Sequence, residues 1–430
     1  MAPGNWCQRV DYLTMSTLYI TRKKDMQQET KEIPVLRLLP KEDRRLSQGH
    51  VWVYSNEVDT AVTPLQGFTA GQVAHLYSHS EKFLGLVMLN PQALICARLI
   101  SRHPEARWGQ ALIKTHLEKA LHLRERFYSR PYYRLCYGDS DALPGLVIDR
   151  FAGVLVLQIS TVGMEQVRSW IVQALVELLQ PEGILLKNDA LSRAQEGLPS
   201  YVEVAYGTVP PTLMVEVSGG VCLSLDAFAG QKTGWFYDHT SSRQWLAPLT
   251  RNRRVLDVFS YVGAWSLQAA VEGASNVVAV DSSAPALALL RDNAVRLGVQ
   301  ERVQTLEGDA FALLAQLREE RQGFDVVILD PPALIKRRKD HRNGLTAYRR
   351  LNELAMRLLP PQGGLLMSCS CSMHLETNEL LDILRASARH LDRNIQLMYQ
   401  GHQGPDHPVL PAVPETAYLR ALAVWVDKTV

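Results

Sequence analysis

A carboxylate and a thiol end two successive apolar segments in the last third of the chain. The first segment, 324–329, leads into Asp330 and two prolines, and the second, 363–368, leads into Cys369. Open α/β sheets bind ligands at the carboxyl ends of their strands, so both groups are predicted at one sheet edge. A thiolate that adds to carbon 6 of a pyrimidine makes carbon 5 nucleophilic. The pair therefore indicates covalent activation of a pyrimidine base, with Asp330 bonding the base at N3 and N4.

The thiol has a structural alternative and a neighbour. Most cysteines behave as small core residues, and an isolated Cys369 would be one of them. Its position in Ser368-Cys369-Ser370, after a predicted strand, favours the catalytic role. Cys371 follows two residues later, and on a continuing strand both thiols would share a face. The pattern thus predicts Cys369 as the nucleophile but leaves the choice between the two thiols open.

Four carboxylates, Asp257, Asp281, Asp309 and Asp330, recur about 20 to 30 residues apart, each at or just after an apolar segment. Any one of them could be a helix cap or a turn residue. The regular spacing instead predicts that all four line one cleft, with Asp281 accepting both ribose hydroxyls of a nucleoside cofactor and Asp309 beside its adenine.

The turn 259–265 decides between cofactors, because it contains a single glycine, Gly263. A dinucleotide site needs several glycines for its pyrophosphate. S-adenosylmethionine has no phosphate and needs one close backbone approach, so it is the predicted cofactor. Its predicted contacts are Asp257, Ser260, Gly263, Asp281, Asp309 and Asp330, and no metal is expected, since the chain has no C-x-x-C pair.

A basic run, Lys336, Arg337, Arg338 and Lys339, begins four residues after Pro332. Charge runs are usually solvated loops. At the rim of the predicted site, however, this run is expected to contact RNA phosphates, and Trp52 is a further candidate for stacking on RNA.

The composition fits a soluble, reduced, cytoplasmic protein of several domains. The 430 residues are 47% hydrophobic and 21% charged, with a net charge of +2 and six cysteines. No segment has the apolar length of a membrane span or the pattern of a secretory signal. The net charge neither favours nor excludes nucleic acid.

The apolar patterns predict an α/β protein with four parts. Residues 1–33 form a weakly ordered extension, 34–104 a small β-barrel, 105–212 a central α+β domain, and 213–430 a doubly wound parallel sheet. The last part opens with a hairpin near 215–225. It then alternates strands (255–259, 277–280, 303–306, 326–329 and 365–369) with helices (264–272, 284–297, 310–321, 346–358 and 375–389).

The motifs resemble the ribosomal RNA large subunit methyltransferase I family. The similarity extends from about residue 35 to the C-terminus and rests on six segments: 49–55, 139–150, 230–238, 259–263, Asp330-Pro331-Pro332 and Ser368-Cys369-Ser370. The resemblance implies an N-terminal PUA domain that binds RNA, a central domain and a Rossmann-like class I methyltransferase domain. It also implies that Cys369 forms 5-methylcytidine in 23S ribosomal RNA or an assembling large subunit, in a chain that could act as a homodimer.

The chain departs from the family pattern around the base pocket. Ala333 replaces a lysine, Thr240 an arginine, and Cys371 a glycine; the cofactor turn reads Val-Gly-Ala-Trp instead of Thr-Gly-Gly-Phe. Methylation of an exocyclic amine, such as guanine N2, therefore remains an alternative, as does an idle RNA-binding assembly factor. A base inside a helix cannot expose carbon 6, so the target is expected to be unpaired or flipped.

Overall fold

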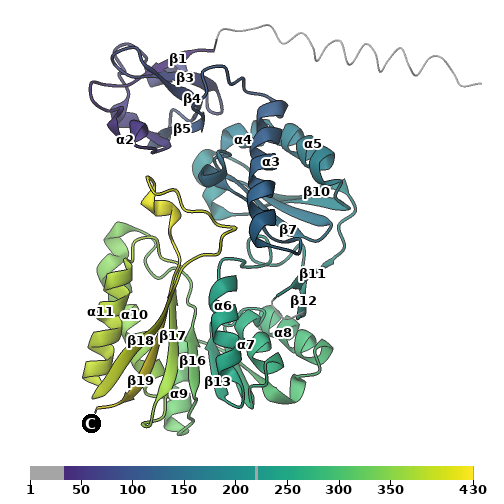
Figure 1. Cartoon of the computed structure of the whole chain (residues 1–430), viewed down its shortest axis with the longest axis vertical. Coiled ribbons are helices and arrows are strands. Elements are labelled where there is room, and N and C mark those ends of the chain that lie inside the picture. Colours follow the sequence, from purple (N-terminus) through teal and green to yellow (C-terminus); the bar gives the residue numbers. More distant parts are fainter. Residues whose placement is uncertain (1–32, 218–220, 430) are drawn as a thin grey trace, which may run out of the picture.

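The computed structural model describes residues 33–217 and 221–429, and the predicted extension lies outside them except for Ile33 (Figure 1). The N-terminal part is a five-stranded sheet of order β1-β3-β4-β5-β2. Alternate residues of these strands meet in one apolar cluster that includes Leu36, Val53 and Leu76. Its elements are β1 Val35–Arg37, α2 Arg44–Ser47, β2 Trp52–Tyr54, η1 Ser55–Glu57, η2 Leu65–Gly67, β3 Val73–Tyr77, β4 Phe83–Leu89 and β5 Ile95–Ser101.

The central part is a second five-stranded sheet, β10-β9-β8-β7-β6, packed against two contacting helices, α3 and α5. Helices α4 and α5 are separate, because the backbone of Val167 between them leaves the helical conformation. Strand β10 was not predicted. The elements are α3 Gln110–Phe127, β6 Tyr132–Tyr137, η3 Gly138–Asp141, β7 Leu146–Phe151, β8 Val154–Ile159, α4 Val162–Gln166, α5 Arg168–Leu179, β9 Gly183–Asn188, η4 Leu191–Glu196 and β10 Tyr201–Gly207.

The C-terminal part is a seven-stranded sheet of order β15-β14-β13-β16-β17-β19-β18. The predicted hairpin precedes it as β11 Thr212–Glu216 and β12 Cys222–Asp226. The strands are β13 Arg254–Val258, β14 Asn276–Asp281, β15 Val303–Glu307, β16 Val326–Leu329, β17 Gly364–Ser370, β18 Arg393–Gly401 and β19 Arg420–Lys428. The helices are α6 Thr240–Leu246, η6 Ala247–Thr250, α7 Ala264–Val271, α8 Ala284–Arg296, η7 Gln300–Arg302, α9 Ala310–Glu319, η8 Arg338–Asp340, α10 His341–Met356, α11 Thr377–His390 and η9 Pro414–Thr416.

Helices cover both faces of this sheet, which confirms the predicted doubly wound architecture. Residues of α6, α7 and α8 form one apolar layer with the sheet, and residues of α9, α10 and α11 form the other. The first five strands in sheet order are parallel. The chain reverses its direction of progress at β13, which pairs with β14 on one side and β16 on the other. This switch point is where such sheets bind ligands.

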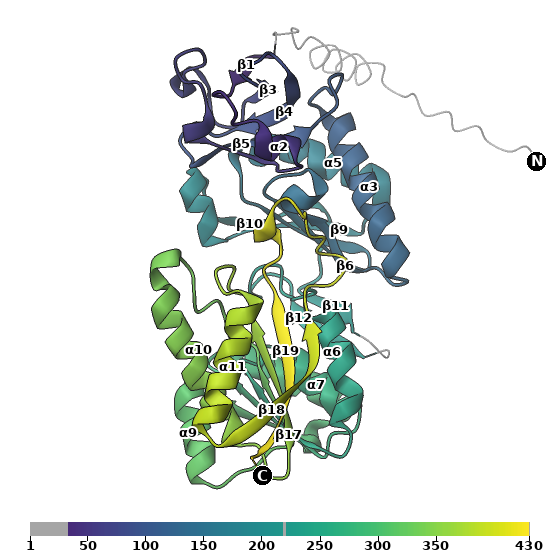
Figure 2. The ribbon, with the colours of Figure 1, turned by 60° about the vertical axis from the view of Figure 1, so that its left-hand side comes forward.

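A long loop between β18 and β19, residues 402–419, connects the C-terminal sheet with the central domain. It reaches from the sheet toward the central domain in both views, where it is drawn in yellow (Figures 1 and 2). The Arg124 guanidinium donates to the Asp406 carbonyl at 2.9 Å, and the Arg134 backbone N–H donates to the Asp406 carboxylate at 3.0 Å. We call residues 402–419 the interdomain loop.

Among the described residues, no helix has the length and apolar character needed to cross a membrane.

Candidate active site

The turn between β13 and α7 brings the backbone close to the neighbouring helix. Phe259, Tyr261 and Gly263 have φ angles of 67°, 50° and 85°. A side chain at Gly263 would place its Cβ 2.6 Å from Cγ of Leu290 in α8, so only glycine fits. The hydroxyl of Ser260 is buried, and no residue in the described part of the chain bonds it. The turn thus leaves a polar atom for a ligand, which fits the predicted cofactor.

Asp281 ends β14 beside this turn and is held by the backbone. Its two carboxylate oxygens accept from the N–H groups of Tyr261 at 2.8 Å and Ser283 at 2.9 Å. The side chain remains partly exposed. Each oxygen keeps a further lone pair, so the carboxylate can accept the ribose hydroxyls of S-adenosylmethionine.

Asp281→Ala is expected to weaken S-adenosylmethionine binding by about 10-fold to 100-fold, because hydrogen bonds to a charged acceptor are lost. Isothermal titration calorimetry measures the change. Asp292→Ala, on the exposed side of α8, is the matched control. Equal dissociation constants for Asp281→Ala and the wild type would remove Asp281 from the cofactor site.

The other two predicted cofactor carboxylates have local partners. Asp309 is exposed and caps α9 by accepting from the Ala312 N–H at 3.0 Å. Asp257 is fully buried and accepts from the Ser266 N–H at 3.0 Å and its hydroxyl at 2.6 Å. Asp257 lies within β13 and its partner Ser266 is in α7, so its side chain faces the layer between the sheet and α7. The structure therefore brings Asp281 and Asp330, but not Asp257, to the open edge.

Burial raises the pKa of Asp257 to about 7, against the opposing effect of its bonds to Ser266, and the charge of Asp330 raises it further. Its Oδ1 atom has no hydrogen-bond partner among the residues that the structure describes, as a protonated acid allows. The folded chain then binds this proton more tightly than the unfolded chain. The stability that this bound proton contributes is fully present below the unfolded-state pKa of 3.8. It is lost as the pH rises through the folded-state pKa of about 7.

Asp257→Asn should therefore gain stability relative to the wild type as pH rises from about 5 to about 8, because an amide has no proton to lose. Thermal melts of both proteins across this range measure the difference. Asp309→Asn, at an exposed cap, provides the control for a general charge effect. Parallel melting curves for Asp257→Asn and wild type would refute a protonated Asp257.

Asp330, immediately after β16, receives two side-chain donors from other segments. His239 Nε2 lies 3.1 Å from its Oδ1, and the Trp265 indole N–H donates to its Oδ2 at 3.1 Å. The donor atoms of His239, Asp330 and Cys369 all lie within 4.8 Å of one another. The histidine and carboxylate are at hydrogen-bond distance, so we interpret them as an ion pair. Sequence reasoning missed His239; the adjoining motif 230–238 was its only signal.

The two thiols have different surroundings. Cys369 is fully buried in the apolar layer that contains Met367 and Ala421, and burial raises the pKa of its thiol, as do Asp330 and Asp257. Cys371 follows β17, is partly exposed, and has Sγ 3.8 Å from the carbonyl of Pro331. Burial and then Asp330 raise the pKa of Cys371 to about 11, whereas Lys232 lowers it. The thiol open to the Asp330 edge is thus Cys371.

The serines on either side of Cys371 are held by a tyrosine that sequence reasoning did not identify. The Tyr348 hydroxyl in α10 lies 2.8 Å from the Ser370 hydroxyl and 3.0 Å from the Ser372 hydroxyl. The Ser372 hydroxyl also accepts from the Ile335 N–H at 3.1 Å. These contacts tie the end of β17 to α10 and to the segment after Asp330. They fix the backbone on both sides of Cys371.

The predicted RNA-binding residues lie in two places. Lys336, Arg337, Arg338 and Lys339 are exposed and directly follow the segment bound to Ser372, so they lie beside the site. Trp52 is in the N-terminal sheet, where the Arg98 guanidinium lies over its ring at 5.4 Å and His50 meets it edge-on. Trp52 is partly exposed, and its stacking on RNA remains a prediction.

Two family models match the chain. Residues 204–423 match an S-adenosylmethionine-dependent methyltransferase, and residues 36–102 match a PUA-like domain. A Streptococcus mutans protein described as a putative S-adenosylmethionine-dependent methyltransferase superposes with a TM-score of 0.77 at 20% identity, covering 91% of this chain and 100% of that one. A protein described as a putative methyltransferase, in complex with S-adenosylhomocysteine, superposes with a TM-score of 0.78 at 20% identity, covering 91% of this chain and 100% of that one. The chain is an S-adenosylmethionine-dependent methyltransferase with a PUA-like N-terminal domain.

Curated relatives define the family. A Shewanella denitrificans protein named ribosomal RNA large subunit methyltransferase I is 32% identical over 396 residues, covering 91% of this chain and 99% of that protein. An Erwinia tasmaniensis protein of the same name is 33% identical over 389 residues, covering 89% and 97%. The chain belongs to the ribosomal RNA large subunit methyltransferase I family, as the resemblance implied.

Proposed function

We propose that this enzyme methylates carbon 5 of a cytosine in 23S ribosomal RNA through a covalent cysteine intermediate. The observation that carries the proposal is the partly exposed Cys371 thiol beside Asp330, at the edge that also presents Asp281 and the glycine turn. The substrate class follows from the names of the curated relatives. The predicted nucleophile was Cys369; the geometry supports Cys371 better, because a buried thiol cannot meet a base.

The reaction divides between the thiol and the carboxylate. The Cys371 thiolate forms a bond to carbon 6, and the electron pair of the carbon 5–carbon 6 double bond becomes available at carbon 5. Asp330 bonds the N3/N4 edge and stabilises the charge that develops there. S-adenosylmethionine supplies the methyl group to carbon 5. Loss of the carbon 5 proton to a base then restores the double bond and releases the thiolate.

The thiolate must be generated from a thiol with a pKa of about 11. Positive charge favours the thiolate, and Lys232 is the cation that lowers the Cys371 pKa. Lys232 belongs to a loop that contacts the cofactor turn, since the N–H of the preceding residue, Gln231, donates to the Tyr261 hydroxyl at 2.9 Å. The sulfonium of a bound cofactor would add to this positive charge.

The RNA partner is supported by the PUA-like domain and by the exposed run Lys336–Lys339. The proposed substrate is 23S RNA, free or in an assembling large subunit, which would place the protein in the cytoplasm.

A homodimer could form through β10, an edge strand whose Val202, Val204 and Tyr206 are exposed.

Methylation of an exocyclic amine is the second candidate. Asp330-Pro331-Pro332 alone could accept a hydrogen bond from guanine N2, and that chemistry needs no thiol. The high pKa of Cys371 favours this alternative, since the free enzyme holds a neutral thiol at neutral pH.

Methyl-labelled S-adenosylmethionine tests the proposal with protein-free 23S RNA and with large-subunit particles, followed by digestion to nucleosides. The expected label is in 5-methylcytidine. Label in methylguanosine would replace the proposal with the amine reaction. Absence of label on both substrates, despite RNA binding, would indicate an idle binding factor.

A further inference from the structure

His239 contacts the proposed base-reading carboxylate from a segment outside the sheet. It directly precedes α6, is 4% exposed, and places Nε2 3.1 Å from Oδ1 of Asp330. Its ring centroid lies 5.4 Å from that of Trp265. The other ring nitrogen, Nδ1, is buried and has no hydrogen-bond partner among the described residues. Within residues 33–217 and 221–429, the imidazole thus has one polar partner, and that partner is Asp330.

The two donors fix the plane of the Asp330 carboxylate. His239 bonds Oδ1 and the Trp265 indole bonds Oδ2, each at 3.1 Å. A carboxylate held at both oxygens cannot rotate about its last bond without losing a hydrogen bond. We propose that His239 is a positioning residue for methyl transfer, which together with Trp265 orients Asp330 toward the target base. This inference rests on the proposed function.

The charges around His239 favour its protonated form. Burial opposes a charged imidazole, but Asp330 and Asp238 outweigh burial and the nearby Arg243, so the pKa of His239 is raised. Cys369 of β17 is a further ionisable neighbour, and its thiol is neutral because its pKa lies well above the ordinary value. The contact with Asp330 is then charge-assisted, and such bonds are about twice as strong as neutral ones.

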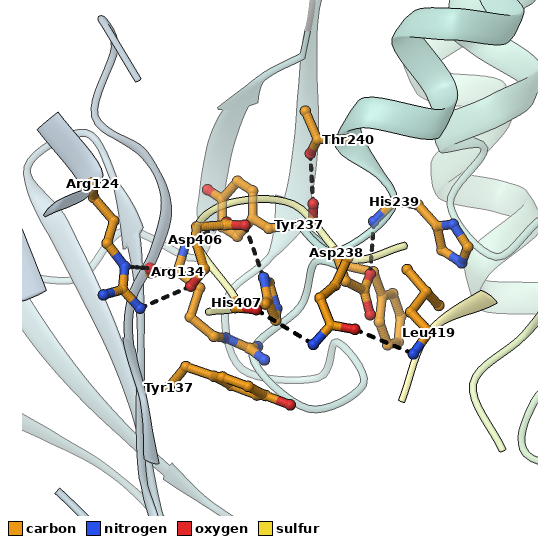
Figure 3. Close-up of polar contacts among 12 residues, drawn as sticks. Arg124, Arg134, Tyr137, Tyr237, Asp238, His239, Thr240, Asp406, His407 and Leu419 are labelled. Atoms are coloured by element: carbon orange, nitrogen blue, oxygen red, sulfur yellow. Dashed lines mark hydrogen bonds and ion pairs between the residues drawn. The ribbon is translucent and has the colours of Figure 1, made fainter. Parts of the chain in front are cut away.

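The backbone of His239 is anchored to the central domain through the interdomain loop (Figure 3). The His239 N–H donates to Asp238 at 3.0 Å, and the Tyr418 hydroxyl donates to the other Asp238 oxygen at 2.6 Å. The Gly404 N–H donates to the Asp238 carbonyl at 3.1 Å. These bonds hold the segment before α6 against the interdomain loop.

The same loop reaches the central domain through Asp406, which bonds Arg124 and the backbone of Arg134 (Figure 3). His407 Nδ1 lies 2.8 Å from Oδ1 of Asp406. A continuous set of polar contacts thus runs from the central domain to His239. Docking of the two domains fixes where His239 meets Asp330.

His239→Ala should lower kcat by about 10-fold to 100-fold, the usual cost of removing the partner that orients a functional group. The KM for S-adenosylmethionine should not change, because the contacts of His239 described above do not include Asp281, Ser260 or Gly263. His239→Gln should recover most of the activity at neutral pH, since its amide can donate to Asp330. His390→Gln, at the exposed end of α11, is the matched control.

The pH profile separates positioning from mere structural support. The ratio of wild-type to His239→Gln kcat, measured from about pH 6 to about pH 9, should fall as the wild-type imidazolium loses its proton. Glutamine has no such titration, so it provides the reference at each pH. A ratio that does not vary with pH would contradict the charge-assisted contact.

A titration of the histidine resonances, which does not depend on enzymatic activity, completes the test. In protein carrying isotope-labelled histidine, the resonance missing from His239→Gln identifies His239. Its pKa should be lower in Asp330→Asn than in the wild type, because the carboxylate charge is gone. An unchanged His239 pKa would contradict the proposed pairing of His239 with Asp330, as would full kcat in His239→Ala across the pH range. A wild type that transfers no methyl group to RNA would instead refute the proposed function, whatever the titration shows.

Discussion

Cys371→Ala is expected to abolish methyl transfer to RNA, with kcat reduced by about a thousandfold or more, the scale seen when an enzyme loses its nucleophile. The variant should still bind S-adenosylmethionine, because the cofactor turn and Asp281 are untouched. Single-turnover assays with labelled cofactor measure the rate, and calorimetry measures the binding. In the wild type the same rate should rise with pH toward the Cys371 pKa of about 11, as more thiolate forms.

Cys369→Ala is the decisive comparison. It removes a buried core atom and should cost about 1 kcal/mol or more of stability, with most of the activity retained. Cys222→Ala, a partly exposed thiol on β12, controls for thiol loss in general. Loss of transfer in Cys369→Ala but not in Cys371→Ala would restore the assignment made from the sequence. Full activity in both would favour the amine reaction.

Asp330→Asn is expected to reduce kcat by about 100-fold to 1000-fold, because the amide cannot carry the charge that stabilises the activated base. It also ends the ion pair with His239 and gives the Trp265 indole a weaker acceptor. The dissociation constant for S-adenosylmethionine should change little. Steady-state rates on 23S RNA together with calorimetry separate the two effects.

Asp325→Asn is a suitable control for that variant, because Asp325 lies at the opposite end of β16 and bonds the Arg254 N–H. A rate for Asp330→Asn within a few-fold of the wild type would show that the carboxylate does not take part in the reaction. Other groups at the carboxyl edge of the sheet would then have to hold the target nucleobase.

The sequence predicted the sheet and its carboxyl edge well, because the signals were local. Apolar segments such as 326–329 and 277–280 bury both faces in a parallel sheet, and such segments are readable without tertiary information. The positions of Asp281 and Asp330 followed from the ends of those segments. The glycine turn followed in the same way, since Gly263 is the one residue there without a side chain.

The rest depended on contacts between distant segments. His239 meets Asp330 from a segment that lies far earlier in the sequence, and the motif 230–238 beside His239 does not by itself predict this contact. The sequence contains two overlapping Ser-Cys-Ser motifs, 368–370 and 370–372, which local sequence cannot distinguish. In the structure Tyr348 contacts both serines of the second motif. Asp257 matched the carboxylate spacing but faces inward, because its place within β13 rather than after it decides its direction.

Trapping with an RNA that carries 5-fluorocytidine at the target tests the central claim most directly. Fluorine at carbon 5 cannot leave as the proton does, so the bond between the thiol and carbon 6 persists after methyl transfer. Digestion and mass spectrometry then identify the residue bound to the nucleotide. The account predicts an adduct on Cys371 that requires S-adenosylmethionine and is missing in Cys371→Ala. An adduct on Cys369, or methyl transfer to unmodified RNA with no adduct on either thiol, would contradict it.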